Sequence, residues 1–138
     1  MSVYSSGTKE FPAKYPNYPV FDNKGNLYYS DSGGDFYRAE GRIVVVRPDG
    51  ATEHLYGGHL HFPNGMAIDA EEKNLYVIQS SASNILRFID PYADRMNRPA
   101  NVAFEPGSTR LFFANLGGFS VNAVDVGEKG LRLKYPKF

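Results

Sequence analysis

The sequence predicts an all-β protein, and three observations support this fold class. The chain has 138 residues, including ten Tyr, ten Phe, fourteen Gly and nine Pro, a composition typical of strands and tight turns. Short apolar runs recur between Gly, Asn, Asp and Pro, and no window keeps the helical apolar period of about 3.6 residues. The third observation is an internal repeat, which predicts several similar small sheets.

The repeat consists of an apolar strand ending in an acidic residue, followed by a second apolar strand. Pro16–Asp22 precedes Leu27–Tyr29, Pro63–Asp69 precedes Leu75–Val77, and a looser copy, Arg98–Glu105, precedes Leu111–Phe113. Asp69 lies 47 residues after Asp22, and Glu105 lies 36 residues after Asp69. A repeat of about 40–45 residues with four short strands is typical of a β-propeller blade.

Each unit is expected to form up to four antiparallel strands. The first has strands near 18–22, 26–30, 42–47 and 51–56, the second near 65–69, 74–79 and 84–89, and the third near 101–104, 110–115 and 119–125, with a fourth at 131–133. Asn23-Lys24-Gly25 and Pro48-Asp49-Gly50 supply hairpin turns. We therefore predict one partial propeller domain over 1–138, with an N-terminal arm at 1–15 and blades near 16–60, 61–95 and 97–136.

Three blades are too few to close a ring, because propellers have about four to eight. An open fan would leave strand edges and apolar faces uncovered. We expect a homodimer that completes a six-bladed ring. A compact open monomer and a partly strand-swapped assembly are the alternatives.

Charge and composition exclude several classes of function. Fifteen Lys and Arg balance fifteen Asp and Glu, so no net field favours nucleic acid or an anionic membrane surface. The absence of Cys excludes disulfides, a thiol nucleophile and thiolate metal sites. Residues 1–6 lack a cationic start and an apolar core, and apolar runs such as Ile43–Val46 are far too short to span a bilayer. These features predict a soluble, cytoplasmic protein.

Three stretches carry a resemblance to a known family: Asn17–Gly33, His61–Val77, and Asn97–Phe104 together with Asp125–Leu131. They resemble the senescence-marker-protein/gluconolactonase family, which includes regucalcin and sugar lactonases. The resemblance implies a six-bladed propeller with a divalent metal, often calcium, at the channel mouth, and hydrolysis of lactones or related esters. It implies that Asn64, within Phe62-Pro63-Asn64-Gly65, and Asn17, before a similar strand, are metal ligands.

The sequence also departs from this family. The opening Glu-Gly-Pro motif is absent, and the only Pro-Asp-Gly, at 48–50, lies in a predicted hairpin turn rather than before an inner strand. The two charged metal ligands that the resemblance implies are therefore unaccounted for. Amide oxygens alone would bind calcium weakly, because affinity rises with the number of carboxylates.

The up-and-down order of the strands predicts which polar residues share one end of the sheets. These are the residues before or at the first strands, those that end the second strands, and the loop 31–41, namely Asn17, Asn64, His61, Asp31, Gln79 and Asn115. Asn101 stands one residue after the position of Asn17 and Asn64, which Ala100 occupies, so strand alternation favours an outward side chain for Asn101.

We assign provisional roles at this end. His61 and Asp31 are candidate catalytic groups that would assist attack by water, and Gln79, Asn115 and Asn101 are candidate substrate contacts. The alternative role of Asn64 is to cap a turn before an inner strand, and for Asn17 this alternative is the favoured one. His59 and His61 would lie on one side of an extended segment, as zinc ligands do, but loop histidines are more often solvent contacts.

Two functions follow from these features. The first is a divalent-metal-dependent lactone or ester hydrolase acting on a small lactone or sugar-like ligand. The second is a non-catalytic propeller remnant that binds a small ligand or a protein. The sequence contains no Gly-x-Ser-x-Gly elbow, P-loop or dinucleotide fingerprint, so serine nucleophile and nucleotide chemistry are unsupported. Asp22, Asp69 and Glu105 fall at the opposite end, where we expect them to stabilise turns.

Overall fold

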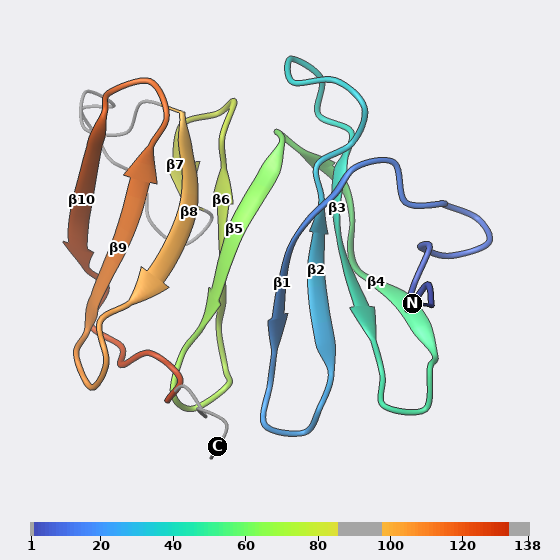
Figure 1. Ribbon diagram of the computed structural model, residues 1–138, viewed down its shortest axis with the longest axis horizontal. Coiled ribbons are helices and arrows are strands. Elements are labelled where there is room, and N and C mark those ends of the chain that lie inside the picture. Colours follow the sequence, from blue (N-terminus) through green and yellow to red (C-terminus); the bar gives the residue numbers. More distant parts are fainter. Residues whose placement is uncertain (1, 86–97, 133–138) are drawn as a thin grey trace.

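The structure, a computed structural model, describes residues 2–85 and 98–132. In these residues ten strands form three antiparallel sheets, and no helix occurs (Figure 1). This confirms the all-β fold class. Accordingly, the described part of the chain contains no helix long and apolar enough to cross a membrane.

Each sheet is a meander of consecutive strands. The first contains β1 (Pro16–Phe21), β2 (Leu27–Asp31), β3 (Gly41–Val46) and β4 (Thr52–Leu60). The second contains β5 (Pro63–Ile68), β6 (Leu75–Gln79) and β7 (Asn84–Ile85), and the third contains β8 (Pro99–Phe104), β9 (Arg110–Asn115) and β10 (Ser120–Asp125). The predicted strand at 84–89 is described only as far as Ile85.

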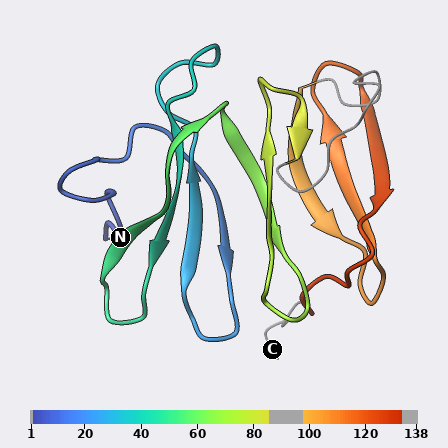
Figure 2. The ribbon, with the colours of Figure 1, turned by 180° about the vertical axis from the view of Figure 1, so that it is seen from behind.

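The sheets stand side by side, with β1 next to β5 and β5 next to β8 (Figures 1 and 2). Apolar side chains fill the spaces between them. Met66 and Val77 of the second sheet pack on Ile43 and Leu60 of the first. From its other face, the second sheet packs Ala67, Tyr76, Ile78 and Ile85 on Val102, Leu111 and Phe113 of the third. Burial of these apolar faces holds the first strands of the three sheets, β1, β5 and β8, beside one another.

The same β-bulge occurs near the start of each first strand. Each of these strands begins with proline, and the register with the second strand shifts between Pro16 and Pro19, Pro63 and Met66, and Pro99 and Val102. A bulge locally bends a strand and re-aims a side chain. The residues that directly follow the three prolines, Asn17, Asn64 and Ala100, are therefore structurally equivalent.

The N-terminal arm covers part of the outer face of the first sheet. Ala13 packs against Tyr29, Val44 and Val46. Further along the arm, Phe11 meets His54 edge-on at 5.1 Å and lies 4.2 Å beneath the guanidinium of Arg42. This face of the first sheet is thus partly protected without a neighbouring sheet.

The prediction of a fourth strand at 131–133 in the third sheet was wrong for the residues that the structure describes. Gly130 instead forms a bridge with Asp69, and the Leu131 amide donates to the Ile68 carbonyl at 2.9 Å. The chain therefore returns to the second sheet after β10. Leu133 and the predicted junction at 90–95 lie outside the described residues.

Acidic residues stabilise the turns at one end of the sheets, as predicted. Asp22 accepts hydrogen bonds from the backbone amides of Lys24 and Asn26, at 2.9 and 2.8 Å, and from the Asn26 side chain at 2.6 Å. Asp69 accepts in the same way from Lys73 and Asn74. These bonds satisfy backbone donors within tight turns.

Candidate functional site

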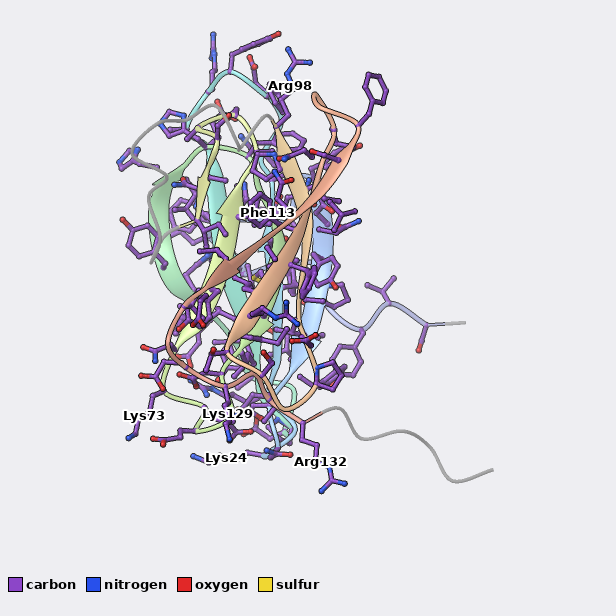
Figure 3. All side chains as sticks on the ribbon, turned by 90° about the vertical axis from the view of Figure 1, so that its left-hand side faces the viewer. Lys24, Lys73, Arg98, Phe113, Lys129 and Arg132 are labelled. Carbon is purple, nitrogen blue, oxygen red and sulfur yellow. The ribbon has the colours of Figure 1, made fainter. Side chains whose placement is uncertain are left out.

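The two ends of the sheets differ in character (Figure 3). Lys24 and Lys73 mark the turn end, and Arg98 marks the opposite end, where the first strands begin. We call this opposite end the mouth, defined by Asn17, Asn64 and Ala100 and the residues that contact them. It is the end at which the sequence predicted a site.

Asn17 and Asn64 make matching side-chain contacts at the mouth. The Nδ2 atom of Asn17 donates to Ser32 Oγ at 3.0 Å, and Nδ2 of Asn64 donates to Ser80 Oγ at 3.1 Å. Both serines directly follow the second strand of their own sheet. Asn64 is only 8% exposed, whereas Asn17 lies at the open side of the first sheet and is exposed. The structure therefore brings the two predicted metal ligands into equivalent settings.

The serine hydroxyls link neighbouring sheets. Ser32 donates to the Pro63 carbonyl at 2.6 Å, and Ser80 donates to the Pro99 carbonyl at 2.5 Å. Nothing in the part of the chain that the structure describes donates to Oδ1 of Asn17 or Asn64. The amide oxygens are thus the free polar atoms of these two side chains.

Asp31, a predicted catalytic residue, is buried and holds the chain that enters the mouth. Its carboxylate accepts the backbone amides of Lys14 at 2.8 Å, Tyr15 at 2.7 Å and Gly33 at 3.2 Å. These three donors occupy both carboxylate oxygens. Asp31 thus fixes the backbone of residues 14–15 and of Gly33, and its catalytic role remains a prediction.

Gln79 takes the place of Asp31 in the second sheet. Its Oε1 accepts the backbone amide of His61 at 2.8 Å, so this predicted substrate contact also braces the entry to a first strand. His61, a predicted catalytic group, is exposed, and its imidazole has no hydrogen bond within the described ranges. Its ring nitrogens are therefore open to solvent.

The remaining predicted contacts lie on the third sheet. Asn115 is buried at the end of β9, and its Nδ2 lies 3.4 Å from Ser120 Oγ. Asn101 is exposed, and Ala100, which is 6% exposed, takes the place of Asn17 and Asn64. The one-residue offset in the sequence thus separates Asn101 from the equivalent positions.

An aromatic cluster spans the mouth and was not predicted. The ring of Phe62 lies 4.9 Å from that of Phe36, in the β2–β3 loop, and 6.0 Å from that of Tyr15. The Arg98 guanidinium lies 5.7 Å from the Phe36 ring. Tyr15, Phe62 and Arg98 all directly precede a proline of a first strand, and their carbonyls accept from Ser32, Ser80 and Leu116. These matching positions in the repeat were the sequence signal for the cluster.

Phe62 and Arg98 also share an uncommon backbone conformation, with φ of 52° at both residues. Bulky side chains are rare in this left-handed region, so the surrounding contacts must hold them there. Towards the turn end of the same strands, a groove of about 300 Å³ follows β1, β5 and β8 and reaches their last residues, Phe21, Ile68 and Phe104. The mouth therefore combines amide oxygens and aromatic faces, and the groove lies apart from its defining residues.

The donor set fits calcium in kind but is incomplete in number. Calcium takes about six to eight oxygen ligands, and Asn17 and Asn64 offer one free amide oxygen each. Among the described residues, no group of three or more His, Cys, Asp or Glu is placed to hold a metal ion. His54, His59 and His61 therefore do not form a zinc cluster with such neighbours.

Sequence comparisons match the chain with lactonases. Lactonase drp35 of Staphylococcus saprophyticus is 33% identical over 69 residues, which are 50% of this chain and 21% of that protein. Lactonase drp35 of Staphylococcus aureus strain USA300 is 32% identical over 68 residues, again 21% of that protein. The matched stretch thus spans about a fifth of the length of these curated relatives.

Structural comparisons place the fold among propellers. A crystal structure of a nidogen/laminin complex contains a chain with a TM-score of 0.64 and 23% identity, covering 86% of this chain and 48% of that one. A structural-genomics protein assigned as a gluconolactonase has a TM-score of 0.54 and 14% identity, covering 94% and 64%. Both neighbours are of propeller type.

The sequence match to a family profile extends well beyond the lactonase alignments. Residues 2–109 match the family described as the SMP-30/gluconolactonase/LRE-like region. This range includes Asn17 and Asn64 with their serine partners. The chain therefore belongs to the SMP-30/gluconolactonase/LRE-like family.

Proposed function

We propose that the protein acts as a divalent-metal-dependent lactone or ester hydrolase, with its site at the mouth. The observation that carries this proposal is the repeated bulge, which presents Asn17 and Asn64 in equivalent settings with their amide oxygens unused. Membership of a gluconolactonase family and the match to lactonases support the reaction class. The aromatic faces beside these amides suit a small lactone or sugar-like ring.

Calcium is the proposed metal, because hard cations prefer neutral and anionic oxygen ligands. Asn17 and Asn64 would supply two of these oxygens. When bound, the metal would polarise the lactone carbonyl and stabilise the negative charge that develops on its oxygen. Asp31 is already occupied by three backbone amides, so the other ligands must come from elsewhere.

His61 is the proposed proton carrier. The oxygen of a water molecule bonds to the lactone carbonyl carbon while the imidazole accepts the water's proton. The ring C–O bond then breaks, and the proton passes from the imidazole to the alcohol oxygen that leaves. Lactone and water thus give a hydroxycarboxylic acid, which ionises and releases a proton to the solvent. Asp31 and Gln79 would act by fixing the segments before Asn17 and Asn64, and Asn115 by contacting the substrate beside them.

We further propose that a second copy of the chain completes the ring. Ala67, Tyr76 and Ile78 of the second sheet are buried by the third sheet. The equivalent positions of the third sheet are Ala103, Phe112 and Ala114, which are also apolar yet face no neighbouring sheet within the described residues. The first sheet of a second copy is the proposed partner, and its outer face offers the partly exposed Leu27 beside the arm that already buries Tyr29.

The function is tested by calorimetric calcium titration together with turnover of a panel of lactones followed by acid release. We expect saturable calcium binding, calcium-dependent hydrolysis, and loss of calcium affinity of about tenfold or more in Asn64→Ala. Asn101→Ala, which changes an exposed amide outside the equivalent positions, is the control and is expected to bind as the wild type does. Absence of both calcium uptake and turnover would reject the hydrolase proposal.

The second candidate function is a binding module without catalysis. It is favoured by the lack of a carboxylate cluster among the residues that the structure places. The same experiment separates the two functions, since binding of a lactone without calcium uptake or hydrolysis would select the binding module.

A further inference from the structure

The serines at the mouth carry an inference that rests on the proposed metal role of Asn17 and Asn64. In the first sheet Asn17 contacts Ser32, which contacts the Pro63 carbonyl, and in the second sheet Asn64 contacts Ser80, which contacts the Pro99 carbonyl. We call each set an amide–serine–carbonyl chain. The two chains run in the same direction, from one sheet to the next.

The chemistry of these groups fixes the orientation of the amide. A backbone carbonyl can only accept, so the single hydroxyl proton of Ser80 is committed to the Pro99 carbonyl. Towards Asn64, Ser80 Oγ can then act only as an acceptor, and the NH₂ group is the only part of the amide that can donate to it. The Oδ1 atom must therefore face away from the serine, on the open side of the bulge.

The third sheet provides an internal comparison. At the positions of Asn64 and Ser80 it carries Ala100 and Leu116. The backbone hydrogen bond that Ser32 and Ser80 donate to Tyr15 and Phe62 has a counterpart in the third sheet. There the Leu116 amide donates to the Arg98 carbonyl at 3.0 Å. Only the hydroxyl is missing, in the one repeat that has no amide to orient. The missing hydroxyl matches both of its contacts, because within the described residues the third sheet has neither an amide to orient nor a following sheet whose carbonyl would accept.

We infer that Ser80 and Ser32 are positioning residues, which hold the amide oxygens of Asn64 and Asn17 in the orientation that binds the metal. Their hydroxyls do not bind the metal themselves. They remove the alternative flipped state of each amide, in which NH₂ rather than oxygen would face a cation.

Ser30 is a matched control for Ser80. Both hydroxyls are buried, with 0% and 1% exposure, and both cross between sheets, since Ser30 Oγ donates to the Asn64 carbonyl at 2.8 Å. Ser30 accepts from the Tyr18 backbone amide and touches no side-chain amide. Ser30→Ala therefore removes a buried hydroxyl that holds the Asn64 backbone, while the Asn64 side-chain amide keeps its bond to Ser80.

The first experiment measures calcium affinity by calorimetry and thermal unfolding without metal. We expect Ser80→Ala to weaken calcium binding by about tenfold or more, in the range found when the partner that orients a metal ligand is removed. We expect Ser30→Ala to lower the unfolding temperature to a similar extent but to keep wild-type affinity. Equal affinity losses in the two variants, or none in Ser80→Ala, would overturn the inference.

A second experiment needs no metal. In protein labelled with ¹⁵N-asparagine, the side-chain NH₂ signals of Asn64 are assigned by their absence in Asn64→Ala. We expect a high heteronuclear NOE for these signals in the wild type and in Ser30→Ala, and a clear fall in Ser80→Ala. An amide that stays equally rigid in Ser80→Ala contradicts the positioning role. If the wild type takes up no calcium, the proposed function fails while this measurement still decides whether serine orients the amide.

Discussion

At the scale of single residues, the internal repeat made the roles of some acidic side chains predictable, whereas the role of Asp31 depends on a contact with the arm that the sequence does not indicate. The turn roles of Asp22 and Asp69 followed from their position after an apolar strand and before Gly or Asn. The three amide donors to Asp31 were not predictable, because two of them come from residues 14–15 of the arm. The sequence alone therefore does not distinguish a carboxylate that contacts substrate from one that accepts backbone hydrogen bonds.

Asp22 gives a testable pH dependence. Burial alone would raise the pKa of its carboxyl, but hydrogen bonds from the Asn26 side chain and backbone outweigh this and lower the pKa below its usual value of 3.8. The ionised form is thus favoured by folding, so its contribution is present above the unfolded-state pKa and is lost as the pH falls through the lower folded-state pKa.

We therefore expect Asp22→Asn to lose less stability than the wild type between about pH 6 and about pH 2.5, measured by urea unfolding. Glu10→Gln, which changes an exposed carboxylate of the arm that has no hydrogen-bond or ion-pair partner among the described residues, should keep the wild-type pH dependence. Parallel pH profiles for the wild type and Asp22→Asn would contradict this assignment.

At the scale of elements, the repeat predicted the first and second strands of each sheet, but not the bulges that begin them. A bulge leaves the apolar alternation largely unchanged, so its presence was visible only as a proline before each Asn or Ala. The strand expected at 131–133 was not found in the described residues, because the backbone of a short apolar segment can form hydrogen bonds with any nearby strand. The Leu131 amide bonds to the Ile68 carbonyl. Here the end of β5 was the nearer partner.

Close approach of two first strands explains the glycine after Asn64. A Cβ atom at Gly65 would lie 2.5 Å from the Ala100 carbonyl oxygen and 2.7 Å from the Val102 nitrogen, both of them backbone atoms that cannot rotate away. We expect Gly65→Ala to lower the free energy of unfolding by about 3 kcal/mol, as overpacking does. Chemical denaturation measures this change.

Gly34→Ala is the control for this prediction, because the nearest atoms to its added Cβ would be side-chain atoms at 3.8 and 4.0 Å. It should leave the unfolding free energy nearly unchanged. Similar losses in the two variants would show that the spacing of β5 and β8 is not the cause.

At the scale of the whole molecule, the sequence predicted the fold class and the side-by-side sheets, since both follow from composition and repeat. The protected outer face of the first sheet was not predictable, because the arm at 2–15 has no strand pattern. The two outer faces therefore differ: the arm packs on one, whereas the other presents Ala103, Phe112 and the 70% exposed Val121.

This open face leads to a prediction about mass in solution. If a second copy covers it, light scattering should give about twice 15.4 kDa for the wild type, and Val121→Lys should give the single-chain mass while keeping its β-sheet circular dichroism. Ala51→Lys, an exposed change in the β3–β4 turn, should remain dimeric. A wild type that stays at the single-chain mass at all concentrations would reject ring completion by a second copy.

The return of the chain after β10 has a mechanical consequence for the third sheet. Its strands lie in the sequence between Ile68, the last residue of β5, and Leu131, whose amide bonds back to the Ile68 carbonyl. In the same return, Gly130 lies so close to the ring of Phe104 that no side chain would fit there. Peeling the third sheet from the second thus requires the tail to detach in the same event. Exchange of the Ala70 and Leu131 amide protons, both tied by this return, then reports on that opening directly.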